Sequence, residues 1–233
     1  GAPPHRTVEQ MAKHYLDELR MVQPHGPYYL AGYCFGSIVA FDMAQKLLGA
    51  GEDVNLLVAF NGPSPSWIRR YGTIGGQPSM QEGPALRERS LPARVAGVLM
   101  NPQKIRRWSG HAVWRIEKTL VDPVRLRLAM KLDRPLSEEQ RESFFFEIAG
   151  HAQTVYEPST YAGPMVVFYG EGVYEDPALG WAGTVGSVET YGIPGPHRGN
   201  RTLMAEPAVL SLSARLQEVL DRARRGELGV RSA

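Results

Sequence analysis

The sequence predicts an α/β fold in which helices flank a parallel β-sheet. Three short apolar runs, at residues 28–32, 54–60 and 163–172, are bounded by Pro, Gly or turn residues, as is typical of strands buried on both faces. Helical patterns separate or follow these runs, and residues 64–161 contain no convincing strand pattern. A chain that alternates strands and helices in this way favours a parallel sheet.

The first predicted helix covers residues 7–23. It places five apolar side chains on one face, namely Val8, Met11, Tyr15, Leu19 and Val22. Thr7 and Gln10 have the spacing of a capping box at its start. After the first strand, residues 37–51 are predicted to form a second helix, which Gly49 or Gly51 ends. The second strand follows this helix directly.

The rest of the chain is predicted to hold a helical insertion and then the end of the sheet. Within the insertion, helices are expected at residues 91–99, 108–120 and 137–153. The third strand follows it. A fourth strand is expected at residues 186–195, and an amphipathic helix at residues 206–225 closes the chain.

Length and composition indicate one domain over residues 1–233, with the insertion 64–161 inside it. Hydrophobic residues make up 43% and charged residues 21%, which is ordinary for a globular protein. The net charge of +2 gives no reason to expect nucleic acid or a membrane as partner. One cysteine excludes an internal disulfide, and no signal peptide, membrane span or metal cluster is visible. We therefore expect a soluble, cytoplasmic protein without metal or bound cofactor.

The stretch GYCFGS, residues 32–37, has the form of a nucleophile elbow. Such an elbow joins a strand to a helix, and its glycines permit a strained turn and close packing of strand on helix. At the start of the helix, the Cys34 sulfur is expected to have a pKa below about 8.5, because the backbone N–H groups favour the thiolate. The N–H of Phe35, which follows the nucleophile, is the expected oxyanion donor. The alternative is that Cys34 is a small buried residue, as most free cysteines are.

His197 is the histidine placed to act as the base. In elbow hydrolases the base follows the nucleophile and the acid along the chain. His5, His14 and His25 precede the elbow, and His111 and His151 fall in the insertion. Only His197 lies on a loop between the last strand and the last helix, where it would exchange a proton with Cys34. The alternative is an ordinary histidine on a surface loop.

Asn61 is the candidate for the third member of the site. It ends the second strand, at the carboxyl edge of the sheet where Cys34 also lies. Its amide oxygen could hold the imidazole in the required tautomer, as in Cys-His-Asn proteases. The alternative is that Asn61-Gly62-Pro63 is only a turn. Three acidic residues after the third strand are rivals for the orienting role, namely Glu171, Glu175 and Asp176.

The chain resembles the thioesterase domains that end nonribosomal peptide and polyketide synthases. The resemblance rests on GPYYLAGYCFGSIVAFDMAQKLLGAGEDVNLLVAFNGPSP, on EDPALGW, and on IPGPHRGNRTLMAEPAV with the helix after it. It is continuous from Thr7 to about Asp221 except in the insertion. The resemblance implies an α/β-hydrolase-like sheet with a helical lid, and no bound cofactor. It also implies that a carrier-protein domain delivers the acyl or peptidyl substrate on 4′-phosphopantetheine. The bound acyl or peptidyl group would then be released by hydrolysis or cyclisation.

This sequence departs from the family pattern at three places. The usual nucleophile is Ser, where this chain has Cys34. The usual acid, 27 residues further on, is Asp, where this chain has Asn61. The family also carries strands upstream of the elbow, which the 33 residues before Cys34 cannot supply. We therefore expect an N-terminally truncated domain that belongs to a longer parent chain.

Two other functions remain open on the sequence alone. One is a stand-alone editing thioesterase or esterase that removes misloaded acyl groups. The other is a non-catalytic, hydrolase-like binding module, because Asn61 is unorthodox and the N-terminus is short. Residues 87–134 carry 12 Lys/Arg against 4 Asp/Glu, which suggests either a solvated helical face or a docking surface for an acidic carrier domain.

Overall fold

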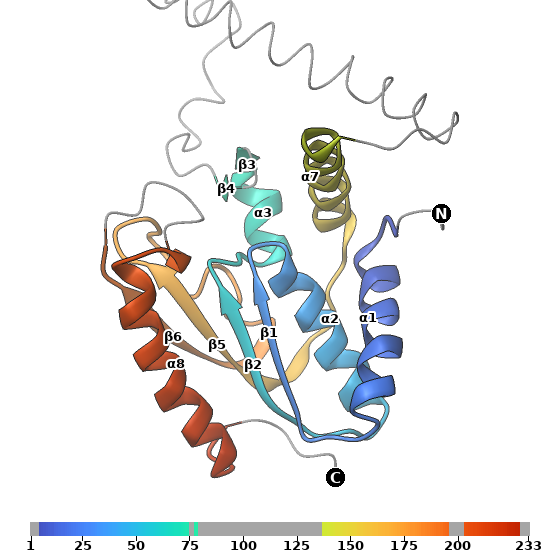
Figure 1. Ribbon diagram of the computed structural model, residues 1–233, viewed down its shortest axis with the longest axis vertical. Coiled ribbons are helices and arrows are strands. Elements are labelled where there is room, and N and C mark those ends of the chain that lie inside the picture. The colour runs from blue at the N-terminus through green and yellow to red at the C-terminus, as the bar shows by residue number, and fades with distance from the viewer. Residues whose placement is uncertain (1–4, 75–76, 79–136, 196–202, 229–233) are drawn as a thin grey trace, which may run out of the picture. The chain divides into compact units, whose positions relative to one another are not determined.

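Four parallel strands form the central sheet of the computed structural model, which describes residues 5–74, 77–78, 137–195 and 203–228 (Figure 1). In spatial order they are β1 (Tyr28–Tyr33), β2 (Val54–Phe60), β5 (Tyr161–Gly170) and β6 (Val185–Ile193). All four predicted strands are confirmed. A parallel sheet with helices on both sides is the α/β-hydrolase-like architecture that the sequence predicts.

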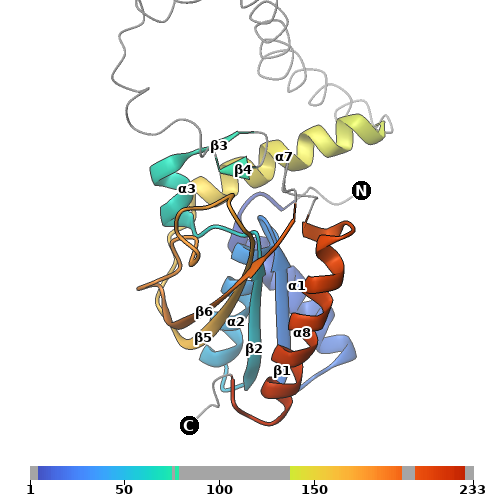
Figure 2. The ribbon, with the colours of Figure 1, turned by 90° about the vertical axis from the view of Figure 1, so that its left-hand side faces the viewer.

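Helices cover both faces of this sheet. Helix α1 (Val8–Val22) packs on α2 (Gly36–Gly49), and α2 and α8 (Ala208–Arg224) pack on the sheet. Helices α1 and α2 lie on one face of the sheet and α8 lies on the other (Figure 2). Side chains of α1 and α2 share one apolar cluster, and those of α8 belong to a second one. Strand β2 serves both clusters, because Leu57 points to the first and Leu56 to the second.

The predicted start of α1 and the predicted end of α2 agree with the structure. The Thr7 hydroxyl accepts a hydrogen bond from the Gln10 backbone N–H at 3.3 Å, as a capping box requires. The second hydrogen bond of a capping box would run from the backbone N–H of Thr7 to the Gln10 side chain. Here the Gln10 side-chain oxygen accepts from the backbone N–H of Arg6 instead. After α2, Gly51 takes a φ of 78°, the left-handed conformation that glycine adopts without a steric cost.

The chain divides into two compact units, residues 1–80 with 149–233, and residues 81–148. The insertion contributes α3 (Pro65–Tyr71), the two-residue strands β3 (Thr73–Ile74) and β4 (Gln77–Pro78), and α7 (Glu138–Val155). The predicted helix at 137–153 is confirmed as α7, whereas those at 91–99 and 108–120 lie outside the described residues. The expectation of no strand in the insertion is wrong, because β3 and β4 pair antiparallel. Two-residue strands are too short to produce a periodic pattern.

The carboxyl ends of the strands meet at one edge of the sheet. Tyr33, the last residue of β1, pairs with Phe60, the last residue of β2, and Phe60 pairs in turn with Phe168 of β5. The residues that follow β1 and β2 are Cys34 and Asn61. Because neighbouring strands lie about 4.8 Å apart, the backbones of these two residues are brought close together.

Candidate active site

Cys34 sits in a strained turn between β1 and α2. Its φ is 53°, in the left-handed region that non-glycine residues rarely adopt. Two backbone hydrogen bonds close the turn. Cys34 N–H donates to the Phe60 carbonyl at 2.9 Å, and Ser37 N–H donates to the Cys34 carbonyl at 3.1 Å. Cys34 is only partly buried, so the turn does not enclose it completely.

The two glycines of the elbow have different roles. A β-carbon on Gly32 would lie 2.2 Å from the Gly36 carbonyl oxygen and 2.4 Å from the Ser37 nitrogen, so no side chain fits there. A β-carbon on Gly36 would meet no described atom within 4 Å. The close approach of strand and helix therefore depends on Gly32, and the strained backbone conformation belongs to Cys34 itself.

Phe35 holds the position expected of the oxyanion donor. It is the N-cap residue of α2, with a φ of −55°, and its carbonyl accepts from Ile38 N–H at 3.0 Å. Its side chain is buried in the cluster beneath the turn. The backbone of Phe35 thus follows the nucleophile at a helix N-terminus, where N–H groups favour an anion. Its role as oxyanion donor stays a prediction.

Asn61 is fixed by β5 on the neighbouring side. Its φ is 46°, a left-handed conformation that Asn tolerates better than most residues, and it is 4% exposed. Its backbone N–H donates to the Phe168 carbonyl at 2.8 Å, and its side-chain oxygen accepts from Gly170 N–H at 3.0 Å. Because a backbone N–H can only donate, the side-chain atom that faces Gly170 is the oxygen, and the other arm of the amide is the NH₂ group.

The predicted partner of Cys34 and Asn61, His197, lies outside the described residues. The contact between the Asn61 oxygen and the imidazole therefore stays a prediction. The structure does show that this oxygen already has one partner, since Gly170 N–H uses one of its two lone pairs.

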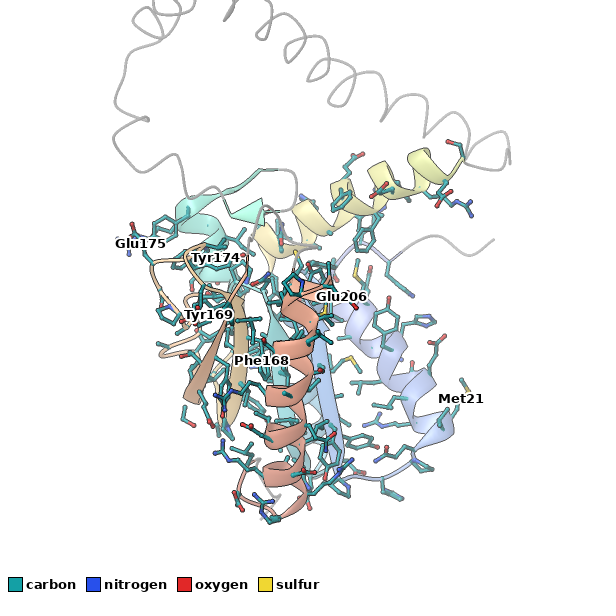
Figure 3. The ribbon with its side chains drawn as sticks, turned by 60° about the vertical axis from the view of Figure 1, so that its left-hand side comes forward. Met21, Phe168, Tyr169, Tyr174, Glu175 and Glu206 are labelled. Carbon is teal, nitrogen blue, oxygen red and sulfur yellow. The ribbon has the colours of Figure 1, made fainter. Side chains whose placement is uncertain are left out.

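The rival acids lie on the loop after β5. Asp176 uses one carboxylate oxygen to accept from Ala178 N–H at 2.9 Å and the other to accept from Gly180 N–H at 2.8 Å. It therefore organises its own loop. Glu171 is exposed, and its carboxylate lies against Gly192 of β6. A β-carbon added to Gly192 would lie 2.7 Å from Oε1 of Glu171. Glu175 is also exposed, on the outer side of the loop (Figure 3).

Tyr174 is a residue near the nucleophile that the sequence analysis did not single out. It follows β5, is 7% exposed, and belongs to the same apolar cluster as Phe35. Burial raises the pKa of Tyr174, and the negative charge of an ionised Cys34 raises it further, so the phenol stays neutral within electrostatic reach of the sulfur. A tyrosine in a loop belongs to no motif, so only the folded structure brings it to this site.

The described part of the chain holds neither a metal-binding cluster nor a membrane-spanning helix. There, no group of three or more His, Cys, Asp or Glu side chains is arranged to hold a metal ion. Among the same residues, no helix combines the length and the apolar character needed to cross a bilayer.

Comparison with known proteins gives a family match for the first third of the chain. Residues 1–81 match the family model described as thioesterase domain. Nonribosomal peptide synthetase apvA of Aspergillus terreus is 48% identical over 63 residues, which are 27% of this chain and 7% of that protein. The match thus spans only a small part of a much longer relative.

Solved structures share the fold over nearly the whole chain. The NocB thioesterase domain from the nocardicin cluster matches with a TM-score of 0.54 at 17% identity, covering 95% of this chain and 77% of that one. A four-domain nonribosomal peptide synthetase bound to AMP and glycine matches with a TM-score of 0.55 at 21% identity, covering 92% of this chain and 16% of that one. Residues 1–81 of this chain are therefore similar in sequence to the thioesterase family, and the chain shares its α/β-hydrolase-like fold with solved thioesterase domains.

Proposed function

We propose that this domain releases an acyl or peptidyl chain from a carrier-bound phosphopantetheine thioester, with Cys34 as nucleophile and His197 as base. The observation that supports this most strongly is the backbone of Cys34. A non-glycine residue at a φ of 53°, between a parallel strand and a helix, has the geometry of an elbow. Left-handed strain of this kind persists where the surrounding structure imposes it, and it is concentrated at functional sites.

The proposed reaction forms and breaks one thioester in its first step. The imidazole takes the proton of the Cys34 thiol, and the thiolate attacks the substrate carbonyl carbon. The carbonyl oxygen becomes an oxyanion, which the Phe35 N–H stabilises. The carbon–sulfur bond to pantetheine then breaks, and its sulfur receives the proton from the imidazolium. Water, or an amine or hydroxyl of the bound chain, attacks the acyl-enzyme in the second step.

The proposed partner is an acyl or peptidyl carrier-protein domain. The relatives named above include nonribosomal peptide synthetases, which supports a substrate that arrives on 4′-phosphopantetheine. The basic stretch at residues 87–134 is the proposed docking surface for the acidic carrier and the phosphate of its arm, and it lies outside the described residues. An editing role would use the same chemistry on misloaded acyl groups.

A covalent acyl-enzyme is the direct test. The domain is incubated with an acyl-pantetheine thioester, and intact mass and peptide mapping follow the adduct. We expect one acyl group on Cys34, lost in Cys34→Ala and strongly reduced in His197→Gln. His14→Gln is the matched control, because His14 lies on α1 and forms an exposed ion pair with Glu18. A folded wild-type domain that forms no adduct would indicate the non-catalytic binding module.

The thiol also supports a proposal about how the chain leaves. Exchange of a carrier thioester for an enzyme thioester is nearly isoenergetic, whereas a serine ester would lower the energy of the acyl donor. An acyl-enzyme that stays activated suits an intramolecular amine or hydroxyl as acceptor. With a substrate that can cyclise, we expect Cys34→Ser to shift the product from ring toward free acid. An unchanged product ratio would count against cyclisation as the reason for the thiol.

A further inference from the structure

The carbonyl of Gly62, directly after Asn61, accepts a hydrogen bond from Trp181. The donor is the indole Nε1–H, the N–O distance is 2.7 Å, and Trp181 is fully buried. The two residues are 119 positions apart in the chain. A buried indole N–H usually has an acceptor, and for Trp181 the acceptor is the peptide that continues the Asn61 turn.

The same peptide touches the nucleophile turn on its other side. A β-carbon on Gly62 would lie 1.9 Å from the Ser37 hydroxyl oxygen and 2.8 Å from the Cys34 carbonyl oxygen. Ser37 is itself fully buried, and its hydroxyl donates to the Gly32 carbonyl at 2.8 Å. Gly62 therefore lies between the elbow and the indole, and only a glycine fits there.

Trp181 is held in place by the loop that Asp176 organises. The two carboxylate oxygens of Asp176 bind Ala178 N–H and Gly180 N–H, and this turns the chain toward Trp181. The Leu179 carbonyl accepts from Ser64 N–H at 2.9 Å, which ties the loop to the segment after Asn61. The indole also packs against Phe41 of α2, with ring centroids 5.0 Å apart.

We propose that Trp181 is a positioning residue, whose indole N–H fixes the Gly62 peptide and thereby sets where Asn61 stands relative to Cys34. The inference rests on the proposed function. A freed Gly62 peptide would let the left-handed Asn61 relax, since strained backbone persists only where its surroundings impose it. Trp181 acts through Asn61 and is therefore a positioning residue, not a catalytic one.

Trp67 offers a matched control for this role. It belongs to the same apolar cluster and is 8% exposed, but its indole nitrogen is buried without a hydrogen-bond partner in the described structure. Trp181→Phe therefore removes a ring edge and a hydrogen bond, whereas Trp67→Phe removes only a ring edge.

The test measures acyl-pantetheine turnover and thermal midpoints for both variants. We expect Trp181→Phe to lower kcat about tenfold with KM changed less than twofold, because the buried Gly62 carbonyl loses its donor and no longer holds the Asn61 turn in place. Trp67→Phe should leave kcat within twofold. In an Asn61→Ala background, Trp181→Phe should lower kcat no further, because the two residues act through one contact. Equal losses of kcat in the two Phe variants, or additive losses with Asn61→Ala, would overturn the proposal.

Two further measurements keep this test separate from the test of the proposed function. The alkylation rate of Cys34 by iodoacetamide needs no turnover, and it should change in Trp181→Phe but not in Trp67→Phe. If the wild type forms no acyl-enzyme, the proposed function is wrong. An unchanged alkylation rate in Trp181→Phe would show that Trp181 does not position Cys34 and Asn61. If Trp181→Phe does not fold, Ser37→Ala probes the other side of the Gly62 peptide, with the same expected non-additivity with Asn61→Ala.

Discussion

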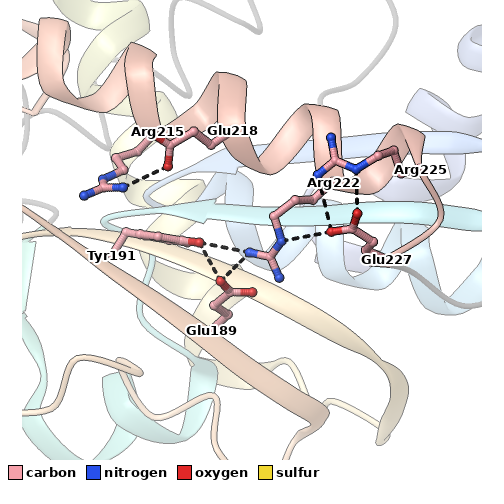
Figure 4. A network of polar contacts seen from close by, with 7 residues as sticks. All are labelled: Glu189, Tyr191, Arg215, Glu218, Arg222, Arg225 and Glu227. Atoms are coloured by element: carbon pink, nitrogen blue, oxygen red, sulfur yellow. Dashed lines mark hydrogen bonds and ion pairs between the residues drawn. The ribbon is translucent and has the colours of Figure 1, made fainter.

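Two polar regions of this molecule are built in opposite ways. At the carboxyl edge of the sheet, Cys34, Asn61 and Leu179 are the described non-glycine residues with positive φ, and backbone hydrogen bonds hold all three. On the far side, β6 and α8 are joined by charged side chains in ordinary backbone conformations (Figure 4). There Arg222 binds Glu189 at 2.6 Å, and their side chains are 32% and 37% exposed.

Among the described residues, the strained backbone conformations lie at the carboxyl edge of the sheet and not in the charged network. The edge depends on buried contacts between neutral groups, which lose a full hydrogen bond or gain a clash when one atom changes. The exposed network depends on ion pairs, which water and salt weaken. Changes at the edge should therefore have large effects on activity or stability, and changes in the network small ones.

Removal of the nucleophile should separate activity from stability most clearly. We expect Cys34→Gly to abolish acyl-enzyme formation, a fall of more than about 10³-fold in turnover. The same change should raise the free energy of unfolding by about 1 kcal/mol, because glycine adopts a φ of 53° without strain. Urea unfolding and acyl-pantetheine turnover measure the two effects. A less stable Cys34→Gly variant would show that the turn is not strained.

A methyl group at the first elbow glycine should unfold the protein. Gly32→Ala places a carbon 2.2 Å from the Gly36 carbonyl oxygen, and we expect it to cost more than about 3 kcal/mol. Gly36→Ala is the control and should change stability by less than about 1 kcal/mol, since its β-carbon meets no described atom within 4 Å. Urea midpoints of the two variants give the comparison. Equal losses would mean that the two glycines are equivalent.

Asn61→Asp should speed hydrolysis. The side-chain oxygen of Asn61 accepts from Gly170 N–H, so the other end of the amide is the NH₂ group, which can only donate. An imidazole that works as a base needs an acceptor beside its second nitrogen. A carboxylate supplies that acceptor, and we expect release of free acid to rise about 10- to 100-fold, measured by product analysis. Asn55→Asp, on β2, is the control. Unchanged or slower hydrolysis would show that the amide oxygen orients the imidazole through its second lone pair.

The buried hydrogen bond between Tyr156 and Asp42 provides a test away from the carboxyl edge of the sheet. Tyr156 donates to Asp42 at 2.8 Å, and burial together with the Asp42 charge raises the pKa of Tyr156. Lys46 forms an ion pair with the other Asp42 oxygen at 2.7 Å. Tyr156→Phe leaves the buried carboxylate short of a donor, so we expect a loss of about 1–3 kcal/mol in urea unfolding.

Tyr161→Phe is the matched control for that change. The Tyr161 hydroxyl is buried without a hydrogen-bond partner in the described structure, and burial raises its pKa to about 12. Its removal should leave stability unchanged or slightly higher. If both Phe variants lose the same free energy, the hydroxyl of Tyr156 is not what stabilises Asp42.

The smallest effect is expected in the exposed network. The hydrogen bond from Arg222 holds the pKa of Glu189 below its ordinary value, so the ionised form is favoured in the folded state. Its stabilisation is present above the unfolded-state pKa of about 4.3 and is lost as the pH falls through the lower folded-state pKa.

Glu189→Gln should therefore cost less than about 1 kcal/mol at pH 7 and nothing in acid below that folded-state pKa. Urea unfolding at both pH values measures the difference, with Glu218→Gln as control for an exposed pair on α8. A loss above 2 kcal/mol at pH 7 would put this network on a level with the sheet edge.

Much of the fold follows from local patterns, and these patterns are complete in the sequence. The apolar runs of β1, β2 and β5, the capped start of α1 and the glycines of the elbow each depend on residues a few positions apart. GYCFGS therefore predicts an elbow from the sequence alone, and the left-handed Cys34 agrees with that prediction. Strands β3 and β4 were missed because two residues carry no periodicity.

The allocation of hydrogen bonds was decided only by tertiary structure. Asn61 reaches Gly170, and Trp181 reaches Gly62, across more than 100 residues of chain. The sequence also offers Asp176 as the residue that orients the imidazole, but its carboxylate accepts hydrogen bonds from the backbone of its own loop. No spacing rule predicts such partners, because each depends on which strand ends become neighbours. The residue types at this edge were thus readable from the chain, but what each polar atom binds depends on how distant segments pack.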